Sequence, residues 1–473
     1  MRELVFAVCV AASAASGAPA AGGGYAVVVS KATSENADWR KVVNVLREKH
    51  RGKAIVYEKS VDESLAALRE QFPRHVCFVA RPEEAGRDFV ARVHRLTRQL
   101  DGDPYTDAIW GILTGYDAAC ALRIAEVRQP LVVRRVAAGT NVELSLCEEG
   151  VWYCELVKNR MVRKEKGGKP RRLRGPDDTT KALAEALTEY KAELFVTSGH
   201  ATERDWQIGY RYRNGQFRCR GGQLYGLDTK RREHPIRSSR AKVYLAVGNC
   251  LMGHVKDRES MALAWLNGAG VCQMVGYTVS TWYGYGGWGM LDYFLEQPGR
   301  HTLAEAFFAN HQALLYRVET YFPQLAEADR AGRPAGSTRL SDQARAAGLR
   351  SGDGRGLMFD RDVVAFYGDP GWSAKMAPAR RAWEQKLTID GGLYTFEITP
   401  RLGEKTFEPI NTNGSQRGGR PIVELLPHRV RDVKIIEGAD LAPLVTDDFV
   451  LVPNPRKCDP KRRYRVVFRA ARR

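Results

Sequence analysis

The sequence contains few cysteines and no closely spaced pair of them. Nine cysteines are spread over 473 residues, and no two are separated by only two residues. Paired spacing of that kind is typical of zinc ribbons, and a high cysteine density is typical of small disulfide-stapled domains. Both classes are therefore excluded, and the spacing assigns no disulfide pairing.

Long apolar runs are also missing, apart from one segment near the start. The run Leu4–Ala15 is too short to span a bilayer, and Ala18-Pro19-Ala20 follows it. A short apolar run before an A-x-A site is the pattern of a signal peptide. We expect residues 1–20 to be a signal peptide and the protein to be secreted, extracellular or periplasmic, without a membrane span. The alternative is a disordered alanine-rich extension.

The sequence also lacks a recognised nucleic-acid-binding motif, although its formal net charge is +18. Arginine is spread along the whole chain, and the one dense basic run, Lys164–Arg174, contains Gly and Pro. Such a run is typical of a solvated loop. We therefore expect no nucleic-acid partner in spite of the charge.

The N-terminal part alternates between short β-rich runs and longer segments of helical period. This order predicts a parallel sheet covered by helices on both faces. The predicted strands are Tyr25–Ser30, Ala54–Glu58, His75–Ala80 and Ile109–Leu113, and the predicted helices are Trp39–Lys49, Asp62–Gln71 and Arg87–Leu100.

The same alternation continues further along the chain. Largely continuous apolar strands, as found here, are typical of a doubly wound sheet that is buried on both faces. The predicted strands are Leu194–Ser198, Val243–Val247 and Val271–Val275, and the predicted helices are Asp178–Tyr190, Arg258–Asn267 and Thr302–Val318.

The C-terminal part has a different pattern, with short strands separated by turn residues. We expect an α/β domain over residues 25–377 and a β-sandwich over 378–473, each with its own core. Residues 326–356, rich in Ala, Arg, Gly, Asp and Ser, are assigned no structure. The predicted sandwich strands are Leu393–Thr399, Ile422–Leu425, Val433–Ile436, Phe449–Val452 and Tyr464–Phe468.

Two of the predicted strands end at residues that can carry chemistry. His200 follows Leu194–Ser198, and Cys250 follows Val243–Val247. The carboxyl ends of parallel strands meet at one edge of a sheet, where ligands bind, so adjacent strands would bring both residues to one crevice. An imidazole can activate a thiol, whose pKa is ordinarily about 8.5, and can return the proton to a leaving amine. The histidine precedes the cysteine by 50 residues, as it does in caspases.

Four segments, in order, resemble the gingipains, a peptidase family with a caspase-like fold. They begin at Gly199, Ala246, Val271 and Phe366. The first contains Gly199-His200 with Glu203 and Trp206; the second contains Cys250 and Ser260–Ala264; the third runs from Val271 to Trp282; the fourth is Phe366-Tyr367-Gly368-Asp369-Pro370. The resemblance covers residues 25–375, and it also implies an immunoglobulin-like domain after the catalytic one.

The resemblance implies a cysteine endopeptidase that acts through a thioacyl-enzyme intermediate on a polypeptide substrate. Cys250 would be the nucleophile and His200 its proton-transfer partner, with an oxyanion hole formed by the backbone of Cys250 and Ala201. Trp282 and Tyr283 would contact substrate, as would Glu203 and Trp206. This chemistry needs no cofactor and no metal.

The sequence departs from the family at two points. Ala201 stands where the family usually has glycine, and alanine tolerates a positive φ poorly. No acidic residue is an obvious match for the one that binds arginine or orients the histidine; Glu148 and Glu149 are the candidates.

Several residues also have plainer interpretations. Cys250 could be a buried structural cysteine, and Cys272 is expected in the core. His254, four residues after Cys250, could share a helical face with it as an alternative base or metal ligand. The Gly-rich aromatic run from Thr281, together with Glu203 and Trp206, could pack for stability alone. The alternatives for the whole chain are a catalytically inactive extracellular binding or scaffold relative and a thiol transpeptidase or acyltransferase.

Overall fold

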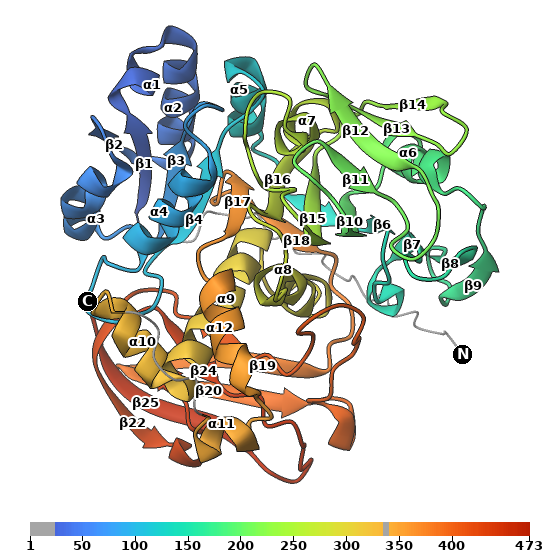
Figure 1. Cartoon of the computed structure of the whole chain (residues 1–473). Coiled ribbons are helices and arrows are strands. Elements are labelled where there is room, and N and C mark those ends of the chain that lie inside the picture. Colours follow the sequence, from blue (N-terminus) through green and yellow to red (C-terminus); the bar gives the residue numbers. More distant parts are fainter. Residues whose placement is uncertain (1–23, 334–339) are drawn as a thin grey trace, which may run out of the picture.

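A single twelve-stranded sheet forms the frame of the protein, in a computed structural model that describes residues 24–333 and 340–473 (Figure 1). The predicted signal peptide, residues 1–20, lies outside the described residues. The strands lie in the spatial order β2 (Lys53–Tyr57), β1 (Tyr25–Ser30), β3 (His75–Val79), β4 (Ile109–Leu113), β17 (Val364–Gly368), β16 (Val271–Tyr277), β15 (Lys242–Asn249), β10 (Leu194–Gly199), β6 (Arg135–Ala138), β7 (Glu149–Tyr153), β8 (Arg160–Lys164) and β9 (Arg171–Arg174).

The sheet is mostly parallel, as predicted. The first five strands in this order are parallel to one another, and so are the next five, from β16 to β7. The two groups meet antiparallel at β16 and β17, and β8 and β9 add an antiparallel edge. Every residue of β1, β4, β10, β16 and β17 is buried, because helices and loops cover both faces of the sheet.

Most of the helices follow strands of this sheet in the chain, and the longest of them begin at clear capping residues. Thr302 and Glu305 form a reciprocal capping box at the start of α9, and the side chain of Asn36 caps α2. The helices are α1 (Lys31–Glu35), α2 (Ala37–His50), α3 (Leu65–Gln71), α4 (Arg87–Thr97), α5 (Ala118–Glu126), α6 (Thr180–Thr188), α7 (Met261–Gly268), α8 (Tyr285–Met290), α9 (Leu303–Tyr321), α10 (Pro323–Arg330), α11 (Asp342–Ala346) and α12 (Ser351–Asp360).

A β-sandwich follows the large sheet, as predicted. Its two antiparallel sheets share one core, which includes Tyr394, Phe396, Val450 and Phe468. One sheet consists of β19 (Trp383–Asp390), β20 (Leu393–Pro400), β25 (Tyr464–Arg472) and β22 (Val430–Glu437), and the other of β21 (Ile422–Leu425), β24 (Phe449–Val452) and β23 (Leu444–Val445).

The three-stranded sheet of the sandwich is buried on both faces. Val450 and Val452 belong to the sandwich core, whereas the alternate residues Phe449 and Leu451 belong to the core of the large sheet. The ring of Phe449 lies edge-on to Tyr105, at 5.5 Å. The sandwich is therefore joined to the α/β part through a continuous apolar seam, below the large sheet in Figure 1.

Some elements differ from the expectations. Residues 326–356 contain the end of α10, all of α11 and most of α12; Gly354 lies against Phe322 and Gly356 against Tyr283, so glycine permits close packing there. The basic run ends in β9, an exposed edge strand paired with β8, and is only partly a loop. Several strands were not predicted, among them β6 to β9 and β17 of the large sheet, strand β19 and a separate four-stranded sheet. That sheet consists of β11 (Asp205–Gln207), β12 (Gln216–Arg220), β13 (Gln223–Leu227) and β14 (Glu233–Ile236).

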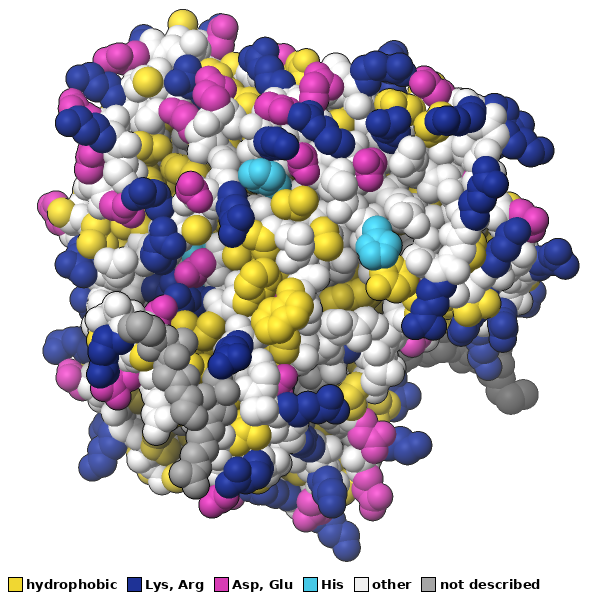
Figure 2. All heavy atoms as spheres, viewed as in Figure 1, with side chains coloured by type: hydrophobic (Ala, Val, Ile, Leu, Met, Phe, Trp, Pro, Cys, Tyr) yellow, Lys and Arg dark blue, Asp and Glu magenta, His cyan; other side chains and the backbone are white. Residues whose placement is uncertain are grey.

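Hydrophobic side chains gather in the middle of one face of the protein. Figure 2 shows charged side chains of both signs around them, Lys and Arg more often than Asp and Glu. In the part of the chain that the structure describes, no helix has the length and apolar character needed to cross a bilayer.

Candidate active site

Four neighbouring strands end, at the same edge of the sheet, next to residues that can carry chemistry. Cys250 directly follows β15, and His200 directly follows β10. Thr140 comes two residues after β6, and Glu155 comes two residues after β7. Because β15, β10, β6 and β7 are adjacent and parallel, their carboxyl ends form one row.

The pairing of β10 with β15 places the backbones of His200 and Cys250 next to each other, directly after the two strand ends. The last matched pair of these strands is Gly199 with Asn249, so the next residue of each strand is a candidate catalytic residue. Asn249 is fully buried and donates a hydrogen bond from Nδ2 to the carbonyl oxygen of Gly199, at 3.0 Å. Its Oδ1 accepts a hydrogen bond from the hydroxyl of Thr197, at 2.6 Å. This buried network joins the two strand ends.

A tight turn holds the thiol of Cys250 at the sheet edge. Leu251 has a φ of 56°, a left-handed conformation that costs a bulky residue about 1–3 kcal/mol. Its N–H donates to the carbonyl of Val279, and the N–H of Gly253 donates to that of Tyr277, so the turn is fixed to the segment around the end of β16. The Cys250 side chain is half-buried, and its Sγ accepts a hydrogen bond from the backbone N–H of Thr281, at 3.2 Å.

The imidazole of His200 is exposed and rests on an aromatic ring. It stacks on Tyr210, with ring centroids 4.6 Å apart. Among the residues that the structure describes, neither ring nitrogen of His200 makes a hydrogen bond, and Cys250 Sγ accepts only the Thr281 N–H. Catalytic hydrogen bonds are often long in a free enzyme and tighten with substrate, so this geometry leaves His200 available as a base.

The backbone around His200 accommodates alanine at position 201. Gly199 has a φ of 103°, whereas Ala201 is not among the residues with positive φ. Alanine is therefore unstrained here, because the left-handed position falls on the glycine before the histidine. Within residues 24–333 and 340–473, the backbone N–H groups of Ala201 and Cys250 donate to no protein acceptor. Both are thus free to bind an oxyanion.

Trp282 and Tyr283 lie differently although they are neighbours in sequence. The Trp282 side chain is 63% exposed, and its ring meets Phe359 of α12 edge-on at 5.6 Å. Tyr283 is buried, and its hydroxyl donates to Asp353 at 3.0 Å. Trp282 is accordingly available to a substrate next to Cys250, whereas the Tyr283 side chain mainly packs the loop against α12.

Glu203 lies in the loop after His200, and Trp206 lies in the short strand β11 that follows this loop; the side chains of both are engaged with other parts of the protein. Trp206 is fully buried against Gly139 and Phe217, so the expectation that it contacts substrate is wrong and packing is its role. Glu203 pairs with Lys256 at 2.9 Å. The hydrogen bond from Lys256 lowers the pKa of Glu203, which keeps this carboxylate ionised.

Neither acidic candidate from the sequence lies at the site. Glu149 begins β7 and faces Arg135 at 3.8 Å, and Glu148 faces Arg134 at 3.5 Å, which places both at the opposite edge of the sheet. The acid at the correct edge is Glu155, which sequence reasoning missed. Recognising residues 149–153 as a strand would have pointed to it.

Glu155 is a buried carboxylate linked to the histidine loop. Its side-chain Oε1 accepts a hydrogen bond from Thr140 at 2.8 Å, whereas Oε2 has no partner among the residues that the structure describes. Its backbone carbonyl accepts the N–H groups of Tyr210, at 2.6 Å, and Arg211, at 3.2 Å. Burial raises the pKa of Glu155. Because Tyr210 stacks on His200, Glu155 helps to place the surface on which the imidazole rests.

The alternative role of His254 needs a helix that does not form. Residues 250–253 are in turns, so Cys250 and His254 do not share a helical face. The described residues contain two groups of potential metal ligands, and His254 belongs to neither. These groups are His94 with His311 and Asp362, and Asp101 with Asp103 and Asp107.

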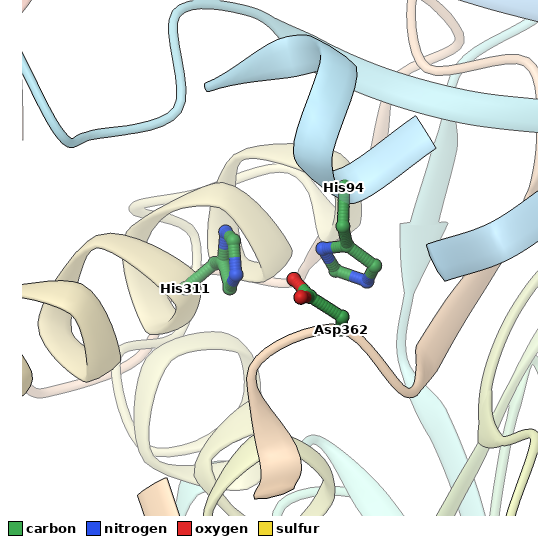
Figure 3. Close-up of side chains that lie close together, drawn as sticks. All are labelled: His94, His311 and Asp362. Atoms are coloured by element: carbon green, nitrogen blue, oxygen red, sulfur yellow. The ribbon is translucent and has the colours of Figure 1, made fainter. Parts of the chain in front are cut away.

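The histidine group is a poor cation site for electrostatic reasons (Figure 3). Asp362 is held by two guanidinium groups, from Arg98 at 2.7 Å and Arg361 at 3.3 Å. Both nitrogens of His311 have partners, the Thr106 hydroxyl at 2.8 Å and the Arg361 carbonyl at 2.9 Å. A cation would have to displace these contacts beside two positive charges.

The arrangement defines an α/β protein with a cysteine and a histidine at the carboxyl edge of adjacent parallel strands, together with a C-terminal β-sandwich. This structure is similar to a solved structure of the Arg-specific cysteine proteinase gingipain R, with 10% sequence identity and a TM-score of 0.46 over 95% of this chain and 98% of that chain. It is also similar to a structure described as a protease, with 9% identity and a TM-score of 0.43 over 95% and 97% of the two chains. No protein-family model and no curated protein matches the sequence.

Proposed function

We propose that the protein is a secreted cysteine endopeptidase with Cys250 as nucleophile and His200 as general base and acid. The observation that carries this proposal is the register of β10 and β15, which sets the two residues side by side at an open sheet edge. The N–H of Thr281 supports the assignment, because it donates to Sγ at 3.2 Å and so holds the thiol in place at the end of the strand.

The proposed reaction follows from the groups at this edge. His200 takes the thiol proton as Cys250 Sγ bonds to the carbonyl carbon of the scissile peptide, and the oxyanion that forms faces the N–H groups of Cys250 and Ala201. The C–N bond then breaks as the imidazolium gives its proton to the departing amine. Water, deprotonated by His200, hydrolyses the remaining thioester and frees the thiol.

The exposed ring of Trp282 gives a polypeptide substrate an apolar surface beside Cys250. It extends from the loop whose Thr281 contacts the thiol, and it packs against Phe359, which is 37% exposed. Large exposed aromatic side chains next to a reactive group are typical of binding sites. Of the residues expected to contact substrate, Trp282 therefore has the clearest structural support.

Alkylation of native thiols with iodoacetamide at pH 6 tests this function. In the described residues, all cysteines are buried except Cys219 and Cys250, which are half-buried. Burial, together with the charge of Glu259, raises the pKa of Cys219 to about 11, so Cys219 is a built-in slow control of similar exposure. We expect peptide mass spectrometry to show rapid labelling at Cys250 alone, and His200→Ala to abolish its advantage.

The same samples distinguish the alternatives. Hydrolysis of a peptide library by the wild-type protein, lost in Cys250→Ala, would establish a peptidase. Transfer of the acyl group to an added amine in preference to water would identify an acyltransferase instead. If Cys250 reacts no faster than Cys219, the chain is an inactive binding relative and the catalytic proposal is wrong.

A further inference from the structure

One loop of the C-terminal β-sandwich reaches the row of strand ends that carries the candidate active site. The loop, residues 411–420, connects the 3₁₀ turn Gly403–Lys405 with β21. The amide of Asn413 donates from Nδ2 to the hydroxyl of Thr140 at 3.1 Å and lies 3.5 Å from Oε1 of Glu155. The C-terminal β-sandwich, which is distant in sequence from the candidate catalytic residues, thus contributes the side chain of Asn413 to the edge of the sheet where they lie.

Buried ion pairs anchor this loop to the α/β part. Arg417 donates to Asp292 at 2.7 Å and to Glu296, and Arg420 donates to Asp292 at 2.8 Å. All four side chains are at most 7% exposed. The two guanidinium groups thus face two acidic side chains, and the N–H of Gly418 adds a further hydrogen bond to Asp292 at 3.1 Å. Buried ion pairs of this kind fix the position of the loop, because moving an arginine away from its acidic partner would leave an unpaired buried charge.

The middle of the loop is fitted to the strand that ends at Cys250. A Cβ atom on Gly414, whose φ is 101°, would lie 2.4 Å from the ring of Trp288. The same ring lies against Gly248, where a Cβ would be 2.9 Å away. Trp288 is therefore sandwiched between the loop and β15, two residues before Cys250. The loop has one tightly determined position at this point.

Asn413 supplies the second protein donor near a carboxylate that has few. Glu155 is 5% exposed, and Thr140 is its other side-chain donor. A buried carboxylate with too few donors becomes protonated or moves toward water. Because the Glu155 backbone carbonyl holds Tyr210 and Arg211, such a movement would shift the ring on which His200 stacks.

We propose that the C-terminal β-sandwich completes the active site, with Asn413 as a positioning residue that acts on His200 through Glu155 and Tyr210. The expected effect on kcat rests on the proposed function. The expected effect on the position of His200 does not. This proposal assigns the sandwich a part in catalysis, as opposed to a separate binding role.

The test compares the full-length wild-type protein with Asn413→Ala and, as a matched control, Asn454→Ala. Asn454 is in the same domain, and within the described part of the chain its side chain accepts a hydrogen bond only from the nearby Arg456 N–H. We expect Asn413→Ala to reduce kcat by roughly ten-fold with little change in KM, and to shift the pH profile of kcat/KM. Asn454→Ala should leave all three unchanged.

A second readout does not depend on peptidase activity. The rate at which diethylpyrocarbonate modifies His200, followed by peptide mass spectrometry, reports the exposure and basicity of the ring. We expect this rate to change in Asn413→Ala at an unchanged melting temperature. An unchanged His200 rate in a folded Asn413→Ala variant would overturn the inference, whether or not the wild type cleaves peptides. If the wild type cleaves nothing and the rate still changes, the proposed function fails and the positioning role stands.

Discussion

Asn249 donates a hydrogen bond to the carbonyl of Gly199, so the residue before the candidate nucleophile directly holds the residue before the candidate base. Both residues are buried, and the hydroxyl of Thr197 completes the network by donating to Asn249. This side-chain bond comes where the ladder between β10 and β15 ends. The Asn249 amide thus reinforces the link between the two strands directly before the thiol and the imidazole.

Asn249→Ala should therefore impair catalysis as well as folding. The change leaves the Gly199 carbonyl and the Thr197 hydroxyl without this partner, which costs about 1–3 kcal/mol of unfolding free energy. Loss of the link should also lower kcat by roughly ten-fold, because the two catalytic residues are no longer held together. Urea unfolding and peptide hydrolysis, measured on the same preparation, check the two effects.

Thr197→Val is the matched control for this prediction. It removes the hydroxyl but preserves the volume and the bond from Asn249 to Gly199. We expect a similar loss of stability with kcat within about two-fold of the wild type. Equal losses of kcat in the two variants would show that general destabilisation, and not the Asn249 link, is responsible.

Position 201 should tolerate glycine but not proline. Alanine is unstrained there, so Ala201→Gly should change kcat by no more than about two-fold. Ala201→Pro removes the backbone N–H that we assign to the oxyanion hole, and removal of one such donor typically costs about 10²–10³ in kcat. Steady-state kinetics at matched melting temperatures provides the measurement. A proline variant of normal kcat would place the oxyanion elsewhere.

Two tryptophans that resemble one another in sequence context should respond in opposite ways. Trp206→Ala empties a fully buried site and should cost about 3–5 kcal/mol of stability. Trp282→Ala removes an exposed ring, so stability should change by at most about 0.5 kcal/mol while KM for peptides rises. Chemical denaturation and peptide kinetics of the pair check this contrast. A stable Trp206→Ala protein with raised KM would restore the substrate role first expected of it.

The sequence was informative where a local pattern determines the structure. Continuous apolar runs before His200 and Cys250 identify two strands of a buried parallel sheet, and the rule that ligands bind at carboxyl ends then predicts the site. The pattern could not distinguish the buried Trp206 from the exposed Trp282, because each closely follows an apolar strand of the large sheet. Their difference arises from Gly139 and Phe217, which lie close to Trp206 only in the folded chain.

Long-range relationships account for the remaining differences. Glu155 joins the site because β7 is two strands away from β10 in the sheet, an order that periodicity does not reveal. Helix α12 forms in a stretch with three glycines, because Leu357 is buried and the chain packs closely at Gly354 and Gly356. Tertiary packing overrides weak helix propensity there. Asn413 lies more than two hundred residues from Thr140 and Glu155, the two residues that its side chain approaches at the sheet edge.

The buried imidazoles should make the fold sensitive to acid. Burial lowers the pKa of His94 to about 4, and the Nε2 of this ring bonds to the Val364 carbonyl at 2.8 Å. Its Nδ1 has no partner in residues 24–333 and 340–473, and Figure 3 shows the ring close to His311 and Asp362. An unfolded histidine has a pKa of about 6.5, so the unfolded state binds the proton first. His94 therefore favours unfolding as the pH falls from about 6.5 towards 4.

The variant His94→Gln separates the contribution of His94 to the pH dependence of stability from that of carboxyl groups with the opposite effect. Burial raises the pKa of Asp107 to about 9 and that of Asp103 to about 7, so these carboxyl groups stabilise the fold as the pH falls through the same window. The wild-type curve therefore contains both effects, and only the difference between the two proteins reports His94. Glutamine can still donate to the Val364 carbonyl, but it does not take up a proton.

We expect His94→Gln to be less stable than the wild type at pH 7.5, because the ring packs edge-on to Trp110 at 4.7 Å. This deficit should shrink by about 2–3 kcal/mol at pH 4.5, where the wild type carries the linkage penalty. Unfolding by urea, followed by tryptophan fluorescence at several pH values, measures the difference. A deficit that stays constant across the range would mean that His94 is already solvated and titrates normally in the folded protein.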